Sequence, residues 1–242
     1  MNAAAEPGTV YLAGAGPGDP NLLTLRVLRL LETANLILPD DLVSAEILSL
    51  AHGGAEVIPV GKRCGQSRIT QAEIHVLMLE AAQAGRSVLR LKSGDPLIFG
   101  RAGEEIAALR GAKIPFEIVP GITTAFAAAA RLKTPLTDRS SASKLILATA
   151  HHAAEKLELT PKWAGALPED ATLVIYMPGR RFHALAEDLI SSGIAGETPC
   201  VAISKATAAD EHVYSTTLAE LDDNAVGPAP VILLIGNAIQ VP

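Results

Sequence analysis

The sequences GAGPGDP at residues 14–20 and KSGDPLIFGR at residues 92–101 are two glycine-aspartate-proline loops, and they decide the fold. A third glycine turn, VPGIT, follows at residues 119–123. Each loop comes directly after an apolar run that is typical of a buried strand. Glycine lets main chain approach another group where a Cβ would clash, and proline fixes the turn. Three such loops therefore predict a binding site for a large, flat, polar small molecule that is held mostly by main chain.

The first half of the chain alternates between strand-like and helix-like patterns. The predicted strands cover residues 10–16, 34–38, 56–60, 87–92 and 116–120. Between them, apolar residues at helical spacing predict helices over residues 23–34 and from residue 70 onward, with Asp19 as a cap for the first and a Thr70–Glu73 capping box for the second. Strands separated by helices predict a parallel sheet with helices on its faces. Ligands bind beyond the carboxyl ends of the strands in such sheets, and the glycine loops stand at those ends.

The second half of the chain also contains strand-like and helix-like patterns, without an internal sequence repeat. Strands are predicted at residues 144–150, 172–177, 199–204 and 230–236, and a helix at 180–192. Five strands therefore fall in the first half and four in the second. The sequence predicts an α/β protein of two domains, residues 1–122 and 123–242.

Composition narrows the classes of function. The chain has 242 residues, of which 49% are hydrophobic and 19% charged, so it can bury a sizeable core. A net charge of -6 and an aromatic content of 3% argue against a nucleic-acid partner. The cysteines Cys64 and Cys200 stand alone, which argues against a zinc site, and no metal is expected. No apolar run is long enough to cross a membrane and the N-terminus lacks a secretory pattern, so we expect a cytoplasmic protein.

A dinucleotide-binding site is the first alternative for the glycine loops. Gly14 and Gly16 match the first two glycines of the G-x-G-x-x-G fingerprint, but Asp19 occupies the position of the third. Asp40, after the second predicted strand, does stand where a ribose-binding acid is expected. The fingerprint is incomplete, which disfavours a nicotinamide- or flavin-dependent oxidoreductase without removing it.

Six motifs together carry a resemblance to a known family. They are GAGPGDP, VGKR (60–63), KSGDPLIFGR, VPGIT, TPLTDR (134–139) and YM (176–177). In this order and spacing the chain resembles the tetrapyrrole methylase superfamily over residues 9–240, and within it the uroporphyrinogen-III C-methyltransferases. The resemblance implies two α/β domains with S-adenosylmethionine in the cleft between them, usually as a homodimer. It also implies a stand-alone methylase, without the dehydrogenase–chelatase half that is fused to some relatives.

The resemblance also implies roles for individual residues. The implied cofactor contacts are Pro17, Ser93, Gly94, Asp95, Ile98, Thr123, Thr124, Met177 and Ala206. By the same analogy Asp40 is the candidate proton acceptor and Lys62 the candidate proton donor. The substrate carries eight carboxylates by this reading, and the basic residues expected to bind them are Lys62, Arg63, Arg101, Arg131 and Arg139.

The implied reaction is two successive methyl transfers to uroporphyrinogen III, which gives precorrin-2 for the synthesis of sirohaem or cobalamin. The chain departs from the family pattern at Pro39, Asp41, Ser93, Asp138 and Ala150. These departures affect the substrate surface more than the cofactor loops, and they leave the identity of the tetrapyrrole open. A methylase of a later corrin precursor such as cobalt-precorrin-4 remains an alternative, as do a methylase of ribosomal RNA or of a translation factor and a tetrapyrrole-binding protein without catalysis.

Overall fold

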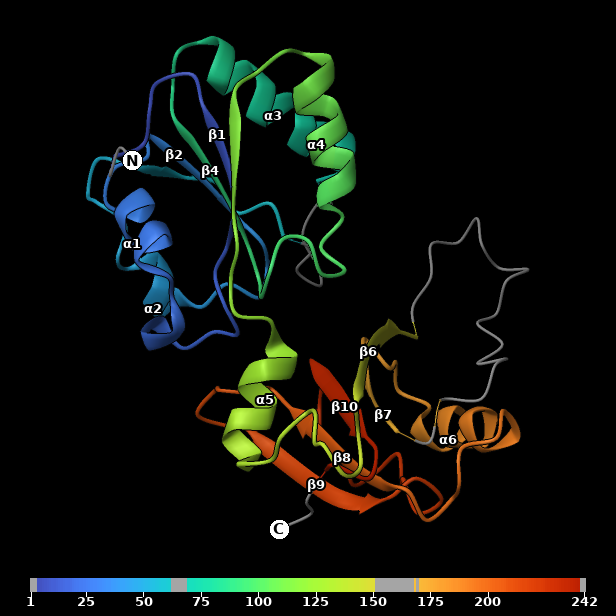
Figure 1. Ribbon diagram of the computed structural model, residues 1–242. Coiled ribbons are helices and arrows are strands. Elements are labelled where there is room, and N and C mark those ends of the chain that lie inside the picture. Colours follow the sequence, from blue (N-terminus) through green and yellow to red (C-terminus); the bar gives the residue numbers. More distant parts are fainter. Residues whose placement is uncertain (1–3, 62–68, 151–167, 169, 240–242) are drawn as a thin grey trace. The chain divides into compact units, whose positions relative to one another are not determined.

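A computed structural model describes residues 4–61, 69–150, 168 and 170–239 of the chain. The chain divides into two compact units, Met1–Thr123 and Thr124–Pro242. Each unit is built around its own sheet and its own apolar clusters, as the ribbon in Figure 1 shows. The structure is therefore of the α/β class that the sequence predicts.

The first unit contains a five-stranded parallel sheet in the order β3-β2-β4-β1-β5. Its strands are β1 (Val10–Gly14), β2 (Leu36–Pro39), β3 (Glu56–Val57), β4 (Val88–Lys92) and β5 (Phe116–Val119). All five were predicted, with β3 shorter than expected. The order places β4, a late strand in the sequence, between β1 and β2.

Helices cover both faces of this sheet (Figure 1). The helices α1 (Leu25–Leu31) and α2 (Ala45–Leu48) pack on one face, and α3 (Gln71–Gln83) and α4 (Ala102–Gly111) pack on the other. The capping box between Thr70 and Glu73 is confirmed at the start of α3. The predicted role of Asp19 needs correction, because it caps a separate turn of 3₁₀-helix, Pro20–Leu22. Thr24 caps α1 instead, its hydroxyl accepting a hydrogen bond from the Val27 amide at 3.3 Å.

The second unit contains a mixed sheet in the order β6-β7-β10-β8-β9. Its strands are β6 (Lys144–Thr149), β7 (Ala171–Tyr176), β8 (Pro199–Ser204), β9 (His212–Thr217) and β10 (Val231–Ile235). Strand β10 runs antiparallel to both of its neighbours, so β7 and β8 point the same way. Strand β9 was not predicted because it is an edge strand with polar, partly exposed residues, and it lacks the apolar run of the others.

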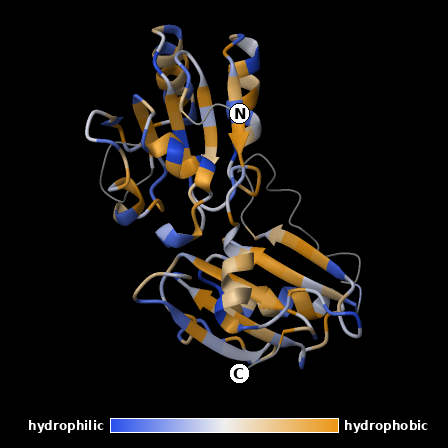
Figure 2. Cartoon of the chain, turned by 60° about the vertical axis from the view of Figure 1, so that its left-hand side comes forward, coloured by the Kyte–Doolittle hydropathy of each residue, from blue (hydrophilic) through white to orange (hydrophobic). Residues whose placement is uncertain are grey.

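Two helices cover opposite faces of the second sheet. Alternate residues of β7 join different apolar clusters, one with α6 (Phe182–Ser191) and one with α5 (Thr124–Leu132). Helix α5 packs through alanines, which allow the helix to lie close to the strands. Figure 2 shows that the hydrophobic residues of both units are concentrated on the strands, where the two cores lie.

Candidate functional site

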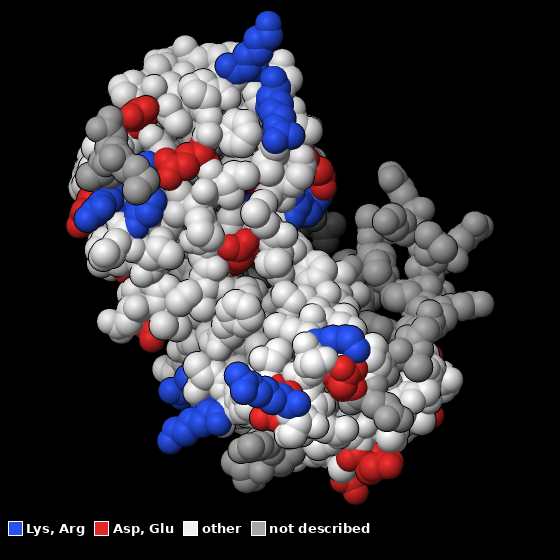
Figure 3. Space-filling model, viewed as in Figure 1, with Lys and Arg blue, Asp and Glu red and all other residues white. Residues whose placement is uncertain are grey.

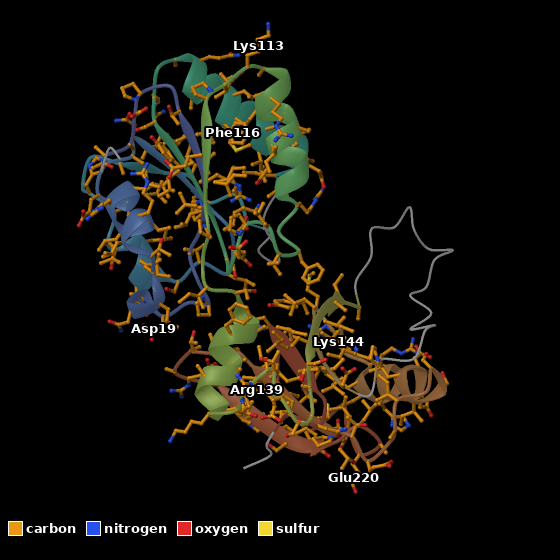
Figure 4. All side chains as sticks on the ribbon, viewed as in Figure 1. Asp19, Lys113, Phe116, Arg139, Lys144 and Glu220 are labelled. Carbon is orange, nitrogen blue, oxygen red and sulfur yellow. The ribbon has the colours of Figure 1, made fainter. Side chains whose placement is uncertain are left out.

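The carboxyl ends of β1 and β4 form the switch point of the first sheet. The two strands are neighbours, but β1 leads to α1 on one face and β4 leads to α4 on the other. The helices that follow the two strands therefore lie on opposite faces of the sheet, and open α/β sheets bind ligands at the edge where the direction reverses. Figure 4 labels Asp19, just beyond β1, at this edge of the unit, and Lys113 at the opposite edge. The first two glycine loops of the sequence thus meet at the position that the fold reserves for a ligand.

The three glycine loops are packed against one another through main chain. Gly16 and Gly94 form an antiparallel bridge, with N···O distances of 3.1 and 2.7 Å. A Cβ on Gly14 would lie 2.5 Å from the Gly94 oxygen, and one on Gly121 would lie 2.2 Å from the same atom. These glycines were expected to clear space for a ligand. The structure shows a different reason at Gly14 and Gly121, which is the close approach of one loop to another.

Asp95 fastens the second loop to the third. Its Oδ2 accepts a hydrogen bond from the Gly121 amide at 3.0 Å, and its Oδ1 accepts one from the Leu97 amide at 2.8 Å. The resemblance implies a cofactor contact for Asp95. In the structure its carboxylate accepts hydrogen bonds from two main-chain amides. Asp95 thereby holds together the rim of the sheet, which is the carboxyl edge formed by the three glycine loops.

The first loop is tied to the segment that follows β2. The hydroxyl of Ser44, at the start of α2, donates to the Gly18 carbonyl at 2.9 Å. Pro17, next to this contact, is partly buried. On the other side of the same segment, a Cβ on Gly61 would lie only 2.2 Å from the Asp41 amide nitrogen. The chain that leads to Lys62 therefore passes against the residue after Asp40, while Lys62 and Arg63 themselves lie outside the described residues.

Asp40 stands at the open end of a buried cluster of charges. Its carboxylate pairs with the Arg90 guanidinium, and its Oδ2 lies 3.9 Å from the Lys92 ammonium nitrogen. Behind it, Glu105 Oε1 accepts hydrogen bonds from Arg90 Nε at 2.9 Å and Lys92 Nζ at 3.1 Å. Glu105 Oε2 is equally close to Lys92 but lacks the geometry of a hydrogen bond. The exposed fractions of the four side chains are 2% for Arg90, 3% for Lys92, 0% for Glu105 and 30% for Asp40.

Burial lowers the pKa of Lys92 below 10.5, and the nearby Arg90 charge lowers it further, while Asp40 and Glu105 act in the opposite direction. Sequence reasoning missed this cluster because residues 87–92 were interpreted only as an apolar strand. A signal was present, since Arg90 and Lys92 are two residues apart and so lie on one face of the strand. Charged side chains inside a buried strand need partners of opposite charge, and Glu105 of α4 is such a partner.

In the second unit, three residues with an implied cofactor role gather at one edge of the sheet. Strands β7 and β8 point the same way, so Met177, after β7, and Ala206, after β8, lie at the same edge. The Tyr176 hydroxyl accepts a hydrogen bond from the Ala125 amide at 3.2 Å, which brings the first turn of α5, and with it Thr124, to the end of β7. Tyr176 and Ala206 also share an apolar cluster with α5.

Left-handed backbone marks these loops in both units. Seven described non-glycine residues have positive φ, and two of them, Lys113 and Lys133, follow helix ends, where such a conformation is common. Of the other five, Arg101 and Met177 have an implied role themselves, and the remaining three are direct neighbours of such residues: Phe99, Lys205 and Thr207. Met177 has φ 48° and is 46% exposed although it is apolar. Such backbone conformations cost energy and persist only where the surrounding structure holds them, and they are most common at functional sites.

Comparison with known proteins assigns the family. The profile of the Tetrapyrrole (Corrin/Porphyrin) Methylases matches residues 9–222. The chain belongs to this family. The siroheme synthase of Nitrosococcus oceani is 41% identical over 239 residues, which are 98% of this chain and 51% of that protein. Siroheme synthase 1 of Yersinia enterocolitica is 43% identical over 97% of this chain and 49% of its own length. The chain thus spans about half the length of these curated relatives.

Solved structures of tetrapyrrole methylases have the same fold. A uroporphyrin-III C-methyltransferase from Thermus thermophilus, complexed with S-adenosyl homocysteine, is 34% identical with a TM-score of 0.79 over 95% of this chain and 98% of that one. A cobalt-precorrin-4 methyltransferase is 30% identical with a TM-score of 0.80 over 96% of this chain and 95% of that one. The tetrapyrrole methylase assignment replaces the alternative of a nicotinamide- or flavin-dependent oxidoreductase.

The arginines of this tetrapyrrole methylase that the sequence predicts for substrate binding, where the structure describes them, are divided between the two units. Arg101 pairs with Glu104 at 2.7 Å on the surface of the first unit, and Arg131 pairs with Glu211 at 3.1 Å in the second. Arg139 is exposed, and no ion pair joins its side chain to another described residue. On the face drawn in Figure 3, basic and acidic side chains are interspersed in both units.

Two kinds of feature are absent from the described residues of this tetrapyrrole methylase. No group of three or more His, Cys, Asp or Glu residues there is placed to hold a metal ion. No helix in that part of the chain combines the length and apolar character needed to cross a membrane.

Proposed function

We propose that this tetrapyrrole methylase is an S-adenosylmethionine-dependent C-methyltransferase that methylates uroporphyrinogen III twice to give precorrin-2. The observation that carries the proposal is the switch-point rim, where three interlocked glycine loops stand beside Asp40. The relatives add support, because two siroheme synthases match nearly all of this chain. Each of them is about twice as long as the chain. The uroporphyrin-III enzyme is also somewhat more similar in sequence than the cobalt-precorrin-4 enzyme.

The residues at the two edges fit the chemistry of the methyl donor. S-adenosylmethionine presents an ammonium, a carboxylate, ribose hydroxyls and a flat purine, all of which main chain and a few side chains can bind. In the first unit the proposed contacts are Pro17, Ser93, Gly94, Asp95, Ile98 and Thr123; in the second they are Thr124, Met177 and Ala206. The exposed, left-handed Met177 supports this set, because an apolar side chain held in that conformation suits the face of a purine.

Bound S-adenosylmethionine supplies an activated methyl carbon, whose bond to sulfur breaks as a bond to a pyrrole carbon forms. The residues of this chain position the reacting atoms and manage the proton that the tetrapyrrole macrocycle releases when the new carbon–carbon bond forms. Positioning accounts for up to about 7–11 kcal/mol in well-oriented reactions. Asp40 is the proposed acceptor of the ring proton and Lys62 the proposed donor, and general acid–base help of this kind contributes typically about 10²–10⁴-fold.

Arginine side chains are the proposed partners of the substrate carboxylates. Arg63, Arg101 and Arg139 are the first candidates, with Arg131 and Lys62 beside them, because guanidinium groups bind carboxylates through two parallel hydrogen bonds. Arg101 would have to exchange Glu104 for the substrate. If an arginine keeps its present surface ion pair when substrate binds, its substitution should not change the affinity for substrate.

Mass spectrometry of uroporphyrinogen III, incubated with the protein and S-adenosylmethionine, tests the proposed function. We expect a product with two added methyl groups. A protein that leaves uroporphyrinogen III unchanged and instead methylates a cobalt-containing corrin precursor would favour the alternative. No turnover with either, combined with tight tetrapyrrole binding, would indicate a binding protein without catalysis.

Asp40→Asn tests the proton acceptor. We expect turnover to fall by about 10²-fold or more, because a neutral amide cannot accept the ring proton. Binding of S-adenosylmethionine, measured by calorimetry, should stay within about twofold. Glu80→Gln is the control, because it removes an exposed carboxylate of α3 outside the glycine loops and the charge cluster, and its turnover should stay close to that of the unmodified protein. Unchanged turnover in Asp40→Asn would remove this residue from the mechanism.

A homodimer is also part of the proposal, on the basis of the family resemblance. Light scattering coupled to size-exclusion chromatography measures the mass directly. A mass of one chain, 25.1 kDa, at micromolar concentration would contradict it.

A further inference from the structure

Lys92 contacts three parts of the rim at once. It is the last residue of β4, directly before the second glycine loop. Its ammonium group lies 3.1 Å from Glu105 of α4 and 3.9 Å from Asp40 at the end of β2. The aliphatic part of the side chain runs beneath the second loop, where a Cβ on Gly100 would lie 3.1 Å from Lys92 Cε. One buried side chain thus joins the candidate proton acceptor, a glycine loop and a helix.

Arg90 holds Asp40 from the other side. Its guanidinium group pairs with Asp40 Oδ1 and donates to the Leu38 carbonyl at 3.0 Å. The Asp40 amide in turn donates to the Leu91 carbonyl at 2.9 Å. Main chain and side chain of Asp40 are therefore both fixed to β4, the strand that carries the second loop.

The charges of this cluster balance, and only one of them reaches the surface. Arg90 and Lys92 are positive, Asp40 and Glu105 are negative, and Asp40 alone has a substantially exposed side chain. Buried ion pairs are a poor source of stability, because the cost of removing the charges from water can exceed their attraction. Apolar side chains would fill this part of the core at lower cost. The cluster therefore has a different advantage, which is to present one carboxylate at the rim in one orientation.

We propose that Lys92 and Arg90 are positioning residues that fix the Asp40 carboxylate for proton transfer, and that Glu105 is the buried counter-charge that allows both cations. The inference rests on the proposed function of Asp40 as proton acceptor. It adds an account of how buried side chains of a strand and a helix control that residue. Lys92 acts through Asp40 and is not itself a reacting group.

Three variants separate positioning from simple stability. Lys92→Met leaves the cluster one charge negative, Glu105→Gln leaves it one charge positive, and Lys92→Met with Glu105→Gln restores balance. We expect the double variant to recover most of the melting temperature lost by Lys92→Met. Its kcat for uroporphyrinogen III should nevertheless stay about 10–100-fold low, because small displacements of a reacting group cost rates of this order. The KM for S-adenosylmethionine should change by less than about twofold.

The outcome that overturns the inference is equally specific. If kcat recovers together with the melting temperature in the double variant, the cluster only stabilises the fold. If Lys92→Met has full kcat, Lys92 does not position Asp40. The melting temperature and the KM are measured alongside kcat because they separate the two cases. A purely structural defect should lower kcat only in variants whose melting temperature is also lowered.

A titration of Lys92 tests the coupling without any activity. The charged groups that act on it are Arg90, Asp40 and Glu105, and Glu104 nearby is influenced by Lys92 and by His75 of α3. The carboxylate of Asp40 raises the pKa of Lys92, so Asp40→Asn should lower this pKa further. NMR of isotope-labelled lysine, with the Lys92 signal assigned through Lys92→Met, measures the shift. Asp41→Asn is the control and should leave the titration of Lys92 in place.

The titration keeps the two proposals distinguishable. A protein that does not methylate uroporphyrinogen III refutes the proposed function, whereas the titration still decides whether Lys92 and Asp40 are coupled. A titration of Lys92 that is the same with Asp40 and with Asn at that position refutes the inference, whatever the substrate proves to be.

Discussion

The two units of this protein use the same kind of sheet edge in different ways. The first unit buries Arg90, Lys92 and Glu105 beneath its rim and locks its loops through contacts between glycines. In the described part of the second unit, the buried polar side chains are Thr134, Thr172 and Ser204, and none is charged. Helix α5 packs there through alanines. The first unit thus holds buried charges at its sheet edge. The second unit has an exposed apolar side chain with left-handed backbone, Met177, at its sheet edge.

The difference indicates a division of labour between the units. In the proposed function, the rim of the first unit supplies the acid–base group for methyl transfer and main-chain donors for the methyl donor. The edge of the second unit supplies the apolar surface for the purine. Substitutions in the buried charge cluster should therefore have larger effects than substitutions in polar turns of the second unit.

The largest expected effect is on the stability of Glu105→Gln. Removing this buried carboxylate leaves Arg90 and Lys92 with one partner carboxylate, and breaking a buried ion pair costs about 3 kcal/mol or more. Urea unfolding measures the loss. Glu104→Gln is the matched control in the next residue, because its pair with Arg101 is half exposed and contributes at most about 1 kcal/mol. Equal effects of the two substitutions would contradict the contrast.

The same variant has a predicted pH dependence. Glu105 raises the pKa of Lys92, so Glu105→Gln lowers that pKa further below its value of 10.5 in the unfolded chain. Between the folded and unfolded pKa values the unfolded state binds more protons, and the stability of the variant rises with pH. The deficit relative to the unmodified protein should therefore narrow as the pH is raised toward 10. A deficit that grows with pH would show that Lys92 is not the group responsible.

An intermediate effect is expected for Gly121→Ala, which tests the packing of the glycine loops. The new Cβ would lie 2.2 Å from the Gly94 oxygen and 2.8 Å from Gly14 Cα, both of which belong to main chain that cannot turn aside. We expect a loss of about 2 kcal/mol in the free energy of unfolding. Gly103→Ala in α4 is the control, because its Cβ meets nothing within 4 Å, and it should stabilise by up to about 1 kcal/mol. Similar unfolding curves for the two variants would contradict the predicted clash.

The smallest effect is expected in the second unit, at Asp138. Hydrogen bonds from Ser140 and Ser141 lower the pKa of this partly exposed carboxyl below 3.8. A depressed pKa contributes stability above the unfolded value that is lost as the pH falls through the folded one. Asp138→Asn should therefore be slightly less stable at pH 7, and the difference should vanish in strong acid. Thermal unfolding at several pH values checks this, and a difference that persists in acid would exclude the carboxylate as its cause.

Local signals were enough to predict most of the elements. The apolar runs before Gly14, Gly94 and Gly121 predicted three strands with loops at their carboxyl ends, because strand periodicity and turn residues act over a few neighbours. The capping box of α3 was found for the same reason. Strand β9 escaped because an edge strand with one exposed face need not be apolar. Asp19 does cap a turn that begins at Pro20, but this turn ends at Leu22 and is separate from α1, since a cap signal does not say how far its helix extends.

The sequence by itself determined where the strands, the glycine loops and the family motifs lie, because these depend on residues that are close together along the chain. Only the tertiary structure decided that β4 lies between β1 and β2, and it is this order that brings Arg90 and Lys92 to Asp40 and packs Gly14 against Gly121. Pairing between strands joins residues far apart in sequence, and the desolvation of charges depends on everything packed around them. Neither the order of the strands nor the burial of the charges can be predicted from local patterns alone.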